Sequence, residues 1–311
     1  MFFSSKSFDP EKDIPSLKGK VILITGGTAG IGKQAVLEFA RHSPKQIWLA
    51  ARNVEKTQAT IDEIRSKIAE APIIPLHLDL ASFESIENAA KKFIAESDRL
   101  DILMLNGGVA GLVPGLTEDG YEIQFGTNHM GHALLTKLLV PKLEQTQRSN
   151  AKSDVRVVVV ASAGHRRAPR GGILFDRLKK ADDENIIGAY GRYCQSKLAN
   201  ILFTRHFATL YPQYTIAAIH PGTIKTDIFS NATAANLAQR ALIYVAGFFL
   251  SSVEYGVKNQ LWASVSPDVQ SGEYYEPIGY GGTASQLGKD DALAEKLWNW
   301  TEKELSCRAK I

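Results

Sequence analysis

The chain has 311 residues, of which 44% are hydrophobic and 22% charged, so it is long enough to bury a sizeable core. Its 36 basic and 33 acidic residues are interspersed and leave a net charge of only +3, which gives nucleic-acid binding little support. Cys194 and Cys307 are too few for a disulfide framework, and no signal peptide is visible, so we expect a reducing, cytoplasmic setting.

The first predicted elements enclose a glycine-rich turn. Residues 1–19 carry mixed charge and two prolines and predict an irregular N-terminal arm. Residues 21–24 are a continuous apolar run, typical of a strand buried on both faces of a parallel sheet, and residues 31–39 have helical apolar spacing. A turn between such elements points a helix N-terminus at a phosphate. We therefore expect dinucleotide binding, the alternative being a turn without a ligand; the binding residues would be Gly26, Thr28, Ala29, Gly30, Ile31 and Gly32.

The second predicted strand, residues 46–50, ends where a dinucleotide site distinguishes NAD from NADP. A site for NAD has an acid here that bonds the ribose 2′-hydroxyl, whereas this chain has Arg52. A guanidinium can bind a 2′-phosphate through two charge-assisted hydrogen bonds, and Lys33 can add a second positive charge. We therefore expect NADP(H); the alternative is that both side chains are ordinary solvated surface cations.

The middle of the chain holds the residues predicted to carry the chemistry. A helical pattern over residues 117–143 contains Asn128, and the predicted strand at residues 155–160 leads into Ser162. A second helical pattern, over residues 190–211, contains Tyr193 and Lys197, which are four positions apart and therefore share a helix face. A free tyrosine has a pKa of about 10. We expect the Lys197 ammonium and a positive nicotinamide to lower the pKa of Tyr193, so that it exchanges a proton with a substrate oxygen that Ser162 polarises.

The remaining predicted features concern metals and the last third of the chain. Three histidines, His129, His132 and His165, have no acid or cysteine at ligand spacing, so we expect packing or capping and no metal site. The longest apolar stretch, residues 241–250, is about half a membrane span. We expect a substrate lid or a buried helix there; contact with a membrane surface and an oligomer interface are the alternatives.

In order and spacing, the glycine turn and the set Ser162, Tyr193 and Lys197 resemble the short-chain dehydrogenase/reductase family. The resemblance implies that Asn128 supports a proton relay and that Lys197 also binds the nicotinamide ribose. It implies cofactor contacts at Asp79, Leu80, Asn106, Gly107, Gly108, Tyr193, Lys197, Pro221, Gly222, Ile224 and Thr226. The chain departs from the family's Asn-Asn-Ala-Gly motif at Leu105 and Gly107.

The order of the predicted elements indicates an α/β fold with a single doubly wound Rossmann-type parallel sheet, flanked by helices on both faces, over residues 20–311. Ser162 and Tyr193 are 31 positions apart, so we expect a substrate-side insert at about residues 164–188, together with a lid at about residues 227–252. The insert and the sequence around Asn128 are similar to retinol-dehydrogenase-like members of the family.

The resemblance implies an NADP(H)-dependent oxidoreductase that interconverts a carbonyl and an alcohol on a lipophilic small molecule. We expect no nucleic-acid partner and no transmembrane segment, and either a monomer or a homodimer. Two alternatives remain: a reductase dedicated to one specialised biosynthetic intermediate, and a catalytically silent NADP(H)-binding interaction protein.

Overall fold

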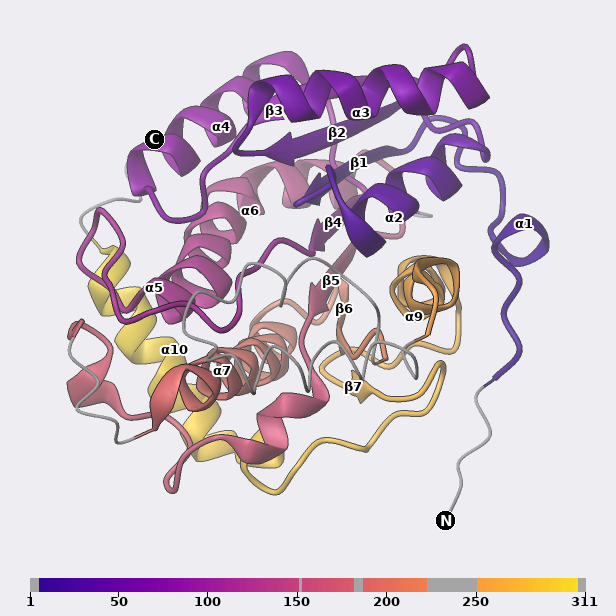
Figure 1. Cartoon of the computed structure of the whole chain (residues 1–311). Helices are drawn as coiled ribbons and strands as arrows, with labels where there is room; N and C mark the ends of the chain where they lie inside the picture. The colour runs from indigo at the N-terminus through magenta and orange to yellow at the C-terminus, as the bar shows by residue number, and fades with distance from the viewer. Residues whose placement is uncertain (1–5, 151–152, 182–186, 223–250, 307–311) are drawn as a thin grey trace.

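The computed structural model describes residues 6–150, 153–181, 187–222 and 251–306 (Figure 1). Among them, seven strands form one parallel sheet in the order β3-β2-β1-β4-β5-β6-β7. The strands are β1 (Val21–Thr25), β2 (Gln46–Ala51), β3 (Ile73–His77), β4 (Ile102–Leu105), β5 (Arg156–Val160), β6 (Thr215–Ile219) and β7 (Tyr274–Tyr275). The predicted α/β fold with a Rossmann-type sheet is confirmed.

Helices cover both faces of the sheet because alternate strand residues point to opposite sides. In β1, Val21 and Leu23 belong to one core cluster, whereas Ile22 and Ile24 belong to the other. One face carries α4 (Phe83–Glu96), α6 (Gly131–Ser149), α7 (Gly188–Leu210) and α10 (Asp291–Leu305), and the other carries α2 (Gly30–Ala40), α3 (Val54–Lys67) and α9 (Val253–Val265) (Figure 1). No helix within the described ranges is long and apolar enough to span a bilayer.

The sheet has a topological switch point between β1 and β4. The chain runs from β1 outward to β2 and β3, and β4 then pairs with the other side of β1. Ligands of open α/β sheets bind beyond the carboxyl ends of the strands at such a point. Gly26 directly follows β1 and Asn106 directly follows β4, so two of the predicted cofactor residues meet at this crevice.

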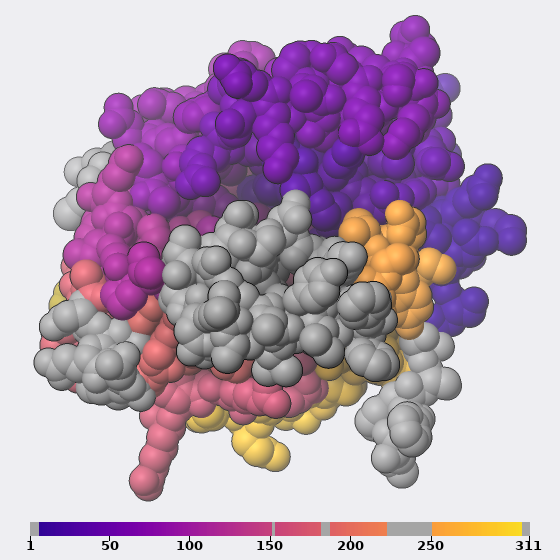
Figure 2. Space-filling model, in the orientation of Figure 1, coloured from indigo at the N-terminus to yellow at the C-terminus, as the bar shows by residue number. Residues whose placement is uncertain are grey.

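The N-terminal arm is more ordered than the sequence predicted. It contains the one-turn helix α1 (Pro10–Asp13), which Asp9 caps by accepting a hydrogen bond from the backbone N–H of Glu11. Phe8, Ile14 and Leu17 are buried in the core cluster that also contains residues of α9. Figure 2 shows residues of α9, in orange, against the indigo N-terminal part of the chain. Apolar residues of the arm therefore extend the core on this face.

The helix predicted over residues 117–143 begins later and is not uniform. Residues 117–121 form a tight turn, in which Thr117 N–H donates to Tyr121 O at 2.7 Å. Gly120 has a φ of +82°, which helices do not adopt. The helix starts only at α5 (Ile123–Phe125), continues as a π-helical turn over Gly126–Met130, and becomes regular in α6. The Thr117 and Gly120 turn therefore explains the late start.

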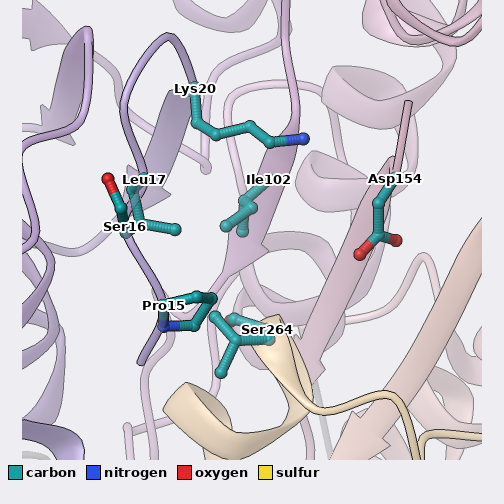
Figure 3. Close-up of a pocket in the computed structure, with 8 residues that line it drawn as sticks. Pro15, Ser16, Leu17, Lys20, Ile102, Asp154 and Ser264 are labelled. Atoms are coloured by element: carbon teal, nitrogen blue, oxygen red, sulfur yellow. The ribbon is translucent and has the colours of Figure 1, made fainter. Parts of the chain in front are cut away.

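A small hollow lies at the amino ends of the strands, on the opposite edge of the sheet from the switch point. It has a volume of about 80 Å³ and is lined by residues that include Lys20, Ile102 and Asp154 (Figure 3). Sites for small organic ligands measure roughly 300–1,000 Å³. The hollow is therefore too small for a dinucleotide or a lipophilic substrate.

Candidate active site

The glycine turn forms a cradle that side chains would fill. Gly26 and Gly30 have φ values of +70° and +49°, which other residues rarely adopt. A Cβ on Gly26 would lie 2.8 Å from Gly107 Cα, and a Cβ on Gly32 would lie 2.3 Å from Gly26 O. The N-terminus of α2 has no side-chain cap, and its first turn has no acidic residue. Its free N–H groups and positive dipole end suit a phosphate.

Asn106 joins the turn to the end of β4. Its Nδ2 donates to Thr25 O at 2.9 Å and to Gly26 O at 3.3 Å. The backbone N–H groups of Asn106 and Gly107 both donate to Thr25 Oγ1. The Asn106 amide therefore holds the glycine turn in place, while its Oδ1 is buried and makes no hydrogen bond to another protein atom. An acceptor left in this way fits a site built for a further donor.

One departure from the family motif lies against Leu80. A Cβ on Gly107 would lie 2.8 Å from Leu80 Cδ1, so an alanine at this position would require the Leu80 side chain to shift. Gly108 is also restricted, because its Cβ would lie 3.0 Å from Asn128 Oδ1. The predicted cofactor residues Leu80, Gly107 and Gly108 therefore lie close to the turn and to Asn128.

Arg52 lies at the end of β2 with 74% of its side chain exposed. Its Nη1 is 4.0 Å from Asp79 Oδ2, so the two predicted cofactor residues adjoin each other. Asp79 Oδ1 accepts from the backbone N–H of Ala81 at 2.9 Å. Lys33, expected to add a second positive charge, forms an ion pair with Glu63 instead. Arg52 is therefore the stronger candidate to bind a 2′-phosphate.

Ser162, Tyr193 and Lys197 come together at the carboxyl end of β5. The Ser162 hydroxyl accepts from the backbone N–H of Gly164 at 3.0 Å, and a Cβ on Gly164 would lie 3.3 Å from Ser162 Oγ and 3.4 Å from Tyr193 Cε1, so Ser162 and Tyr193 both flank this glycine. Lys197 lies on the same face of α7 as Tyr193, with its Nζ 5.8 Å from the centre of the tyrosine ring. Lys197 Nζ donates to Val160 O at 2.8 Å. The three predicted catalytic side chains therefore form one cluster.

The expected lowering of the Tyr193 pKa is wrong for the groups that the protein itself supplies. Burial raises the pKa of Tyr193 to about 12, although the hydrogen bond from Ser162 lowers it. Burial also lowers the pKa of Lys197 to about 8. Both shifts have the same cause, because burial disfavours the charged form of either group. The lysine is directed at Val160 O rather than at the phenol oxygen, which limits its effect on Tyr193.

Asn128 lies in the π-helical turn and is fully buried. Its Oδ1 accepts from Val109 N–H at 2.8 Å, and its Nδ2 donates to Val109 O at 2.9 Å and to Ser196 Oγ at 2.9 Å. π-Helical turns are rare and are frequent at functional sites. Asn128 thus links the segment after β4 to α7 beside Lys197, and its role in a proton relay stays a prediction.

The histidines bond to protein groups. His132 connects Thr25 Oγ1, at 2.9 Å from Nε2, with Asn128 O, at 3.0 Å from Nδ1. His165 Nδ1 donates to Ser162 O at 2.7 Å, and its Nε2 accepts from Ser285 N–H. His129 Nε2 lies 3.1 Å from Thr301 Oγ1. Burial lowers the pKa values of His129 and His132 to about 3, so both are neutral. The described residues contain no group of side chains arranged to hold a metal ion.

The turn after β6 is described only in part. Pro221 and Gly222 follow His220, whose carbonyl accepts from Asn259 Nδ2 at 2.8 Å, and Gly222 has a φ of +89°. Ile224, Thr226 and the apolar stretch at residues 241–250 lie outside the described residues, as does the predicted lid up to residue 250. The lid and the contacts of these two residues therefore remain predictions.

The insert after Ser162 contacts the C-terminal part of the chain. It contains short 3₁₀ helices at Ala163–Arg167 and Phe175–Arg177. Arg166 pairs with Glu276 at 2.6 Å, and Arg167 donates to Tyr190 OH at 3.2 Å. Sequence reasoning missed the roles of three buried residues, namely Glu122, Gln124 and Arg192. The backbone partners of Gln124 and Arg192 lie in other segments, so no local pattern marks these two residues.

Comparisons with known proteins agree with this geometry. The profile of the family described as short chain dehydrogenase matches residues 20–173. The chain is 37% identical to an uncharacterized oxidoreductase of Schizosaccharomyces pombe, over 94% of this chain and 86% of the relative. It is 34% identical to human retinol dehydrogenase 13, over 91% of this chain and 83% of that protein.

Two solved structures share the fold. An uncharacterized protein from Mycobacterium paratuberculosis is 27% identical, with a TM-score of 0.72, and the match covers 95% of this chain and 97% of that one. A short chain dehydrogenase from Escherichia coli, complexed with NADPH, is 21% identical, with a TM-score of 0.62, and the match covers 84% of this chain and 97% of that one.

Proposed function

The chain belongs to the short-chain dehydrogenase/reductase family of oxidoreductases and is retinol-dehydrogenase-like, and from this premise we propose an NADP(H)-dependent enzyme that interconverts a carbonyl and an alcohol on a lipophilic small molecule. One observation carries the proposal. Ser162 and Tyr193, which both flank Gly164, lie at the same edge of the sheet as the glycine cradle. A proton donor and a dinucleotide cradle in one crevice are what a hydride-transfer enzyme requires.

The glycine cradle and Asn106 are the residues that would hold the cofactor, which supplies or accepts the hydride when it is bound. The free N–H groups at the start of α2 would bind the pyrophosphate. Arg52 would bind the 2′-phosphate, because its guanidinium is exposed and because the sequence has Ala51 and Arg52, rather than an acid, directly at the end of β2. The NADPH complex of the structural neighbour from Escherichia coli is consistent with this choice.

Tyr193 would exchange the proton with the substrate oxygen. At neutral pH the phenol keeps its proton, since burial raises its pKa to about 12. The Ser162 hydroxyl would hydrogen-bond the same substrate oxygen and stabilise negative charge that develops on it. Lys197 adds positive charge beneath the ring and would bind the nicotinamide ribose. These side chains orient the oxygen, supply its proton and stabilise its charge.

The substitution Tyr193→Phe tests the proposal, because it keeps the ring and removes only the hydroxyl. NADPH should bind as in the wild type, while turnover of carbonyl substrates falls by about 10² or more. Tyr190→Phe is the matched control, because Tyr190 stacks on Tyr193 and is 46% exposed. NADPH consumption is followed with a panel of aliphatic and aromatic aldehydes and ketones. Near-normal turnover in Tyr193→Phe would refute the mechanism, and NADPH binding without turnover of any carbonyl would favour a silent binding protein.

A further inference from the structure

The segment that follows β4, residues 109–112, is held at three successive points by buried side chains. Asn128 bonds both the N–H and the carbonyl of Val109. Gln124 Oε1 accepts from Gly111 N–H at 2.9 Å, and Arg192 Nη2 donates to Leu112 O at 2.9 Å. All three side chains are at most 4% exposed. We refer to residues 109–112 as the wall segment.

Two of these side chains also tie the wall segment to the start of α7. Gln124 Nε2 donates to Ala189 O at 2.9 Å, so one amide joins the wall segment to the first turn of that helix. Arg192 is itself a residue of α7, next to Tyr193 in the chain. The wall segment and the catalytic helix are therefore fixed relative to each other by Gln124 and Arg192.

Arg192 is held in turn by a buried carboxylate. Its Nε forms an ion pair with Glu122 Oε1 at 3.1 Å, and the side chains of both residues are about 5% exposed or less. Glu122 Oε2 accepts from the backbone N–H of Phe125 at 2.8 Å, which caps α5. A buried ion pair costs desolvation energy that hydrophobic residues of similar volume would not. Its presence therefore suggests a role in positioning rather than in stability alone.

The wall segment lies against the catalytic tyrosine. Ala110 is 1% exposed and packs in one cluster with Tyr193 and Cys194. Beyond the wall segment the chain presents an apolar side chain at Val113, which is 52% exposed. An apolar substrate whose carbonyl oxygen is at Tyr193 would therefore extend along this segment.

We propose that Glu122, Gln124 and Arg192 are positioning residues that hold the wall segment rigid beside Tyr193, so that it forms the side of the pocket that selects bulky apolar carbonyls. The inference rests on the proposed function. A loose wall would lose its contacts with a long apolar chain but would leave a short substrate almost unaffected, because the short substrate reaches only Tyr193 and Ser162.

The experiment compares propanal with decanal in the full chain, using NADPH. Gln124→Met removes the amide and keeps the volume of the side chain. Arg192→Lys keeps the charge, but its single ammonium cannot reproduce the two-sided contact with Leu112 O and Glu122. We expect KM for decanal to rise about tenfold in Gln124→Met and less in Arg192→Lys. The kcat and KM for propanal, the affinity for NADPH and the pH profile should change less than about twofold.

Thr146→Val is the matched control. Thr146 is fully buried in α6 and accepts from Leu100 N–H at 2.7 Å, at the opposite edge of the sheet. The control loses a comparable buried hydrogen bond and should keep the ranking of the two aldehydes. The inference is overturned if the ratio of KM for decanal to KM for propanal is unchanged in Gln124→Met and Arg192→Lys. It is also overturned if this ratio shifts equally in Thr146→Val.

Hydrogen–deuterium exchange supplies a readout that does not depend on activity. The amide of Gly111, whose N–H donates to Gln124 Oε1, should exchange faster in Gln124→Met than in the wild type, while Thr146→Val leaves it unchanged. If this amide exchanges at the wild-type rate in Gln124→Met, the inference that Gln124 holds the wall segment rigid is refuted. A wild-type chain that binds NADPH and reduces neither aldehyde contradicts the proposed function instead. In that case the exchange data still decide whether Gln124 holds the wall segment rigid.

Discussion

Replacing Gly32 by alanine should displace the helix end that we propose binds the pyrophosphate. The added Cβ would lie 2.3 Å from Gly26 O and 2.4 Å from Asn106 Nδ2, whereas a comfortable contact is about 3.5 Å or more. Neither neighbour can easily give way. Gly26 O belongs to the backbone of the turn, and Asn106 Nδ2 donates to Thr25 O and Gly26 O. The start of α2 must therefore move by about 1 Å.

Two opposing effects set the magnitude for Gly32→Ala. Overpacking costs about 1–3 kcal/mol, whereas alanine in place of glycine within a helix gains up to about 1 kcal/mol. The free energy of unfolding should therefore fall by about 0–3 kcal/mol. The affinity for NADPH has no such compensation, because the moved N–H groups no longer face the phosphate. If the full 1–3 kcal/mol falls on binding, the affinity drops about 5- to 150-fold.

NADPH titration and urea unfolding of Gly32→Ala measure the two quantities separately. Gly115→Ala is the control, since a Cβ at Gly115 meets nothing within 4 Å and its backbone has no positive φ. This control should bind NADPH as the wild type does and be stabilised by at most about 1 kcal/mol. If Gly32→Ala bound NADPH within twofold of the wild type, the cradle would not be the pyrophosphate site.

Three further outcomes are expected. Arg52→Ala should lose most of the preference for NADPH over NADH, and equal wild-type affinities in the same titration would contradict the choice of NADP(H). Lys197→Met should abolish turnover yet raise the free energy of unfolding by about 1–3 kcal/mol at pH 7, because burial lowers the pKa of Lys197 from 10.5 to about 8. This gain in stability should be complete below pH 8 and should disappear as the pH rises through 10.5. Urea unfolding at several pH values measures it. Gly107→Ala should cost about 1 kcal/mol, and a double-mutant cycle with Leu80→Ala should show that the cost disappears when Leu80 is shortened.

Much of the fold was predictable because short patterns carry it. The run at residues 21–24 is fully buried in β1, and the glycine turn stands between β1 and α2 as expected. Failures came where a distant contact decides the outcome. The arm is ordered because Phe8 and Ile14 enter the core.

Gln124 and Arg192, which hold the wall segment, were missed for the same reason. Gln124 and Arg192 bond backbone atoms that lie 13 to 80 positions away along the chain. Each is a polar residue in a helix, and its sequence context predicts an ordinary solvent-facing side chain. Only the tertiary structure reveals that both side chains are buried and directed at one segment.

The electrostatics of Tyr193 and Lys197 also follow from burial rather than from their spacing. A four-residue interval places both on one face of α7, but the ammonium bonds Val160 O and lies 5.8 Å from the centre of the ring. The Ser162 hydroxyl, in contrast, lowers the pKa of the phenol. With a pKa raised to about 12 by burial, Tyr193 is held as a proton donor at neutral pH. We infer that the protein's own groups favour donation of this proton to a carbonyl oxygen.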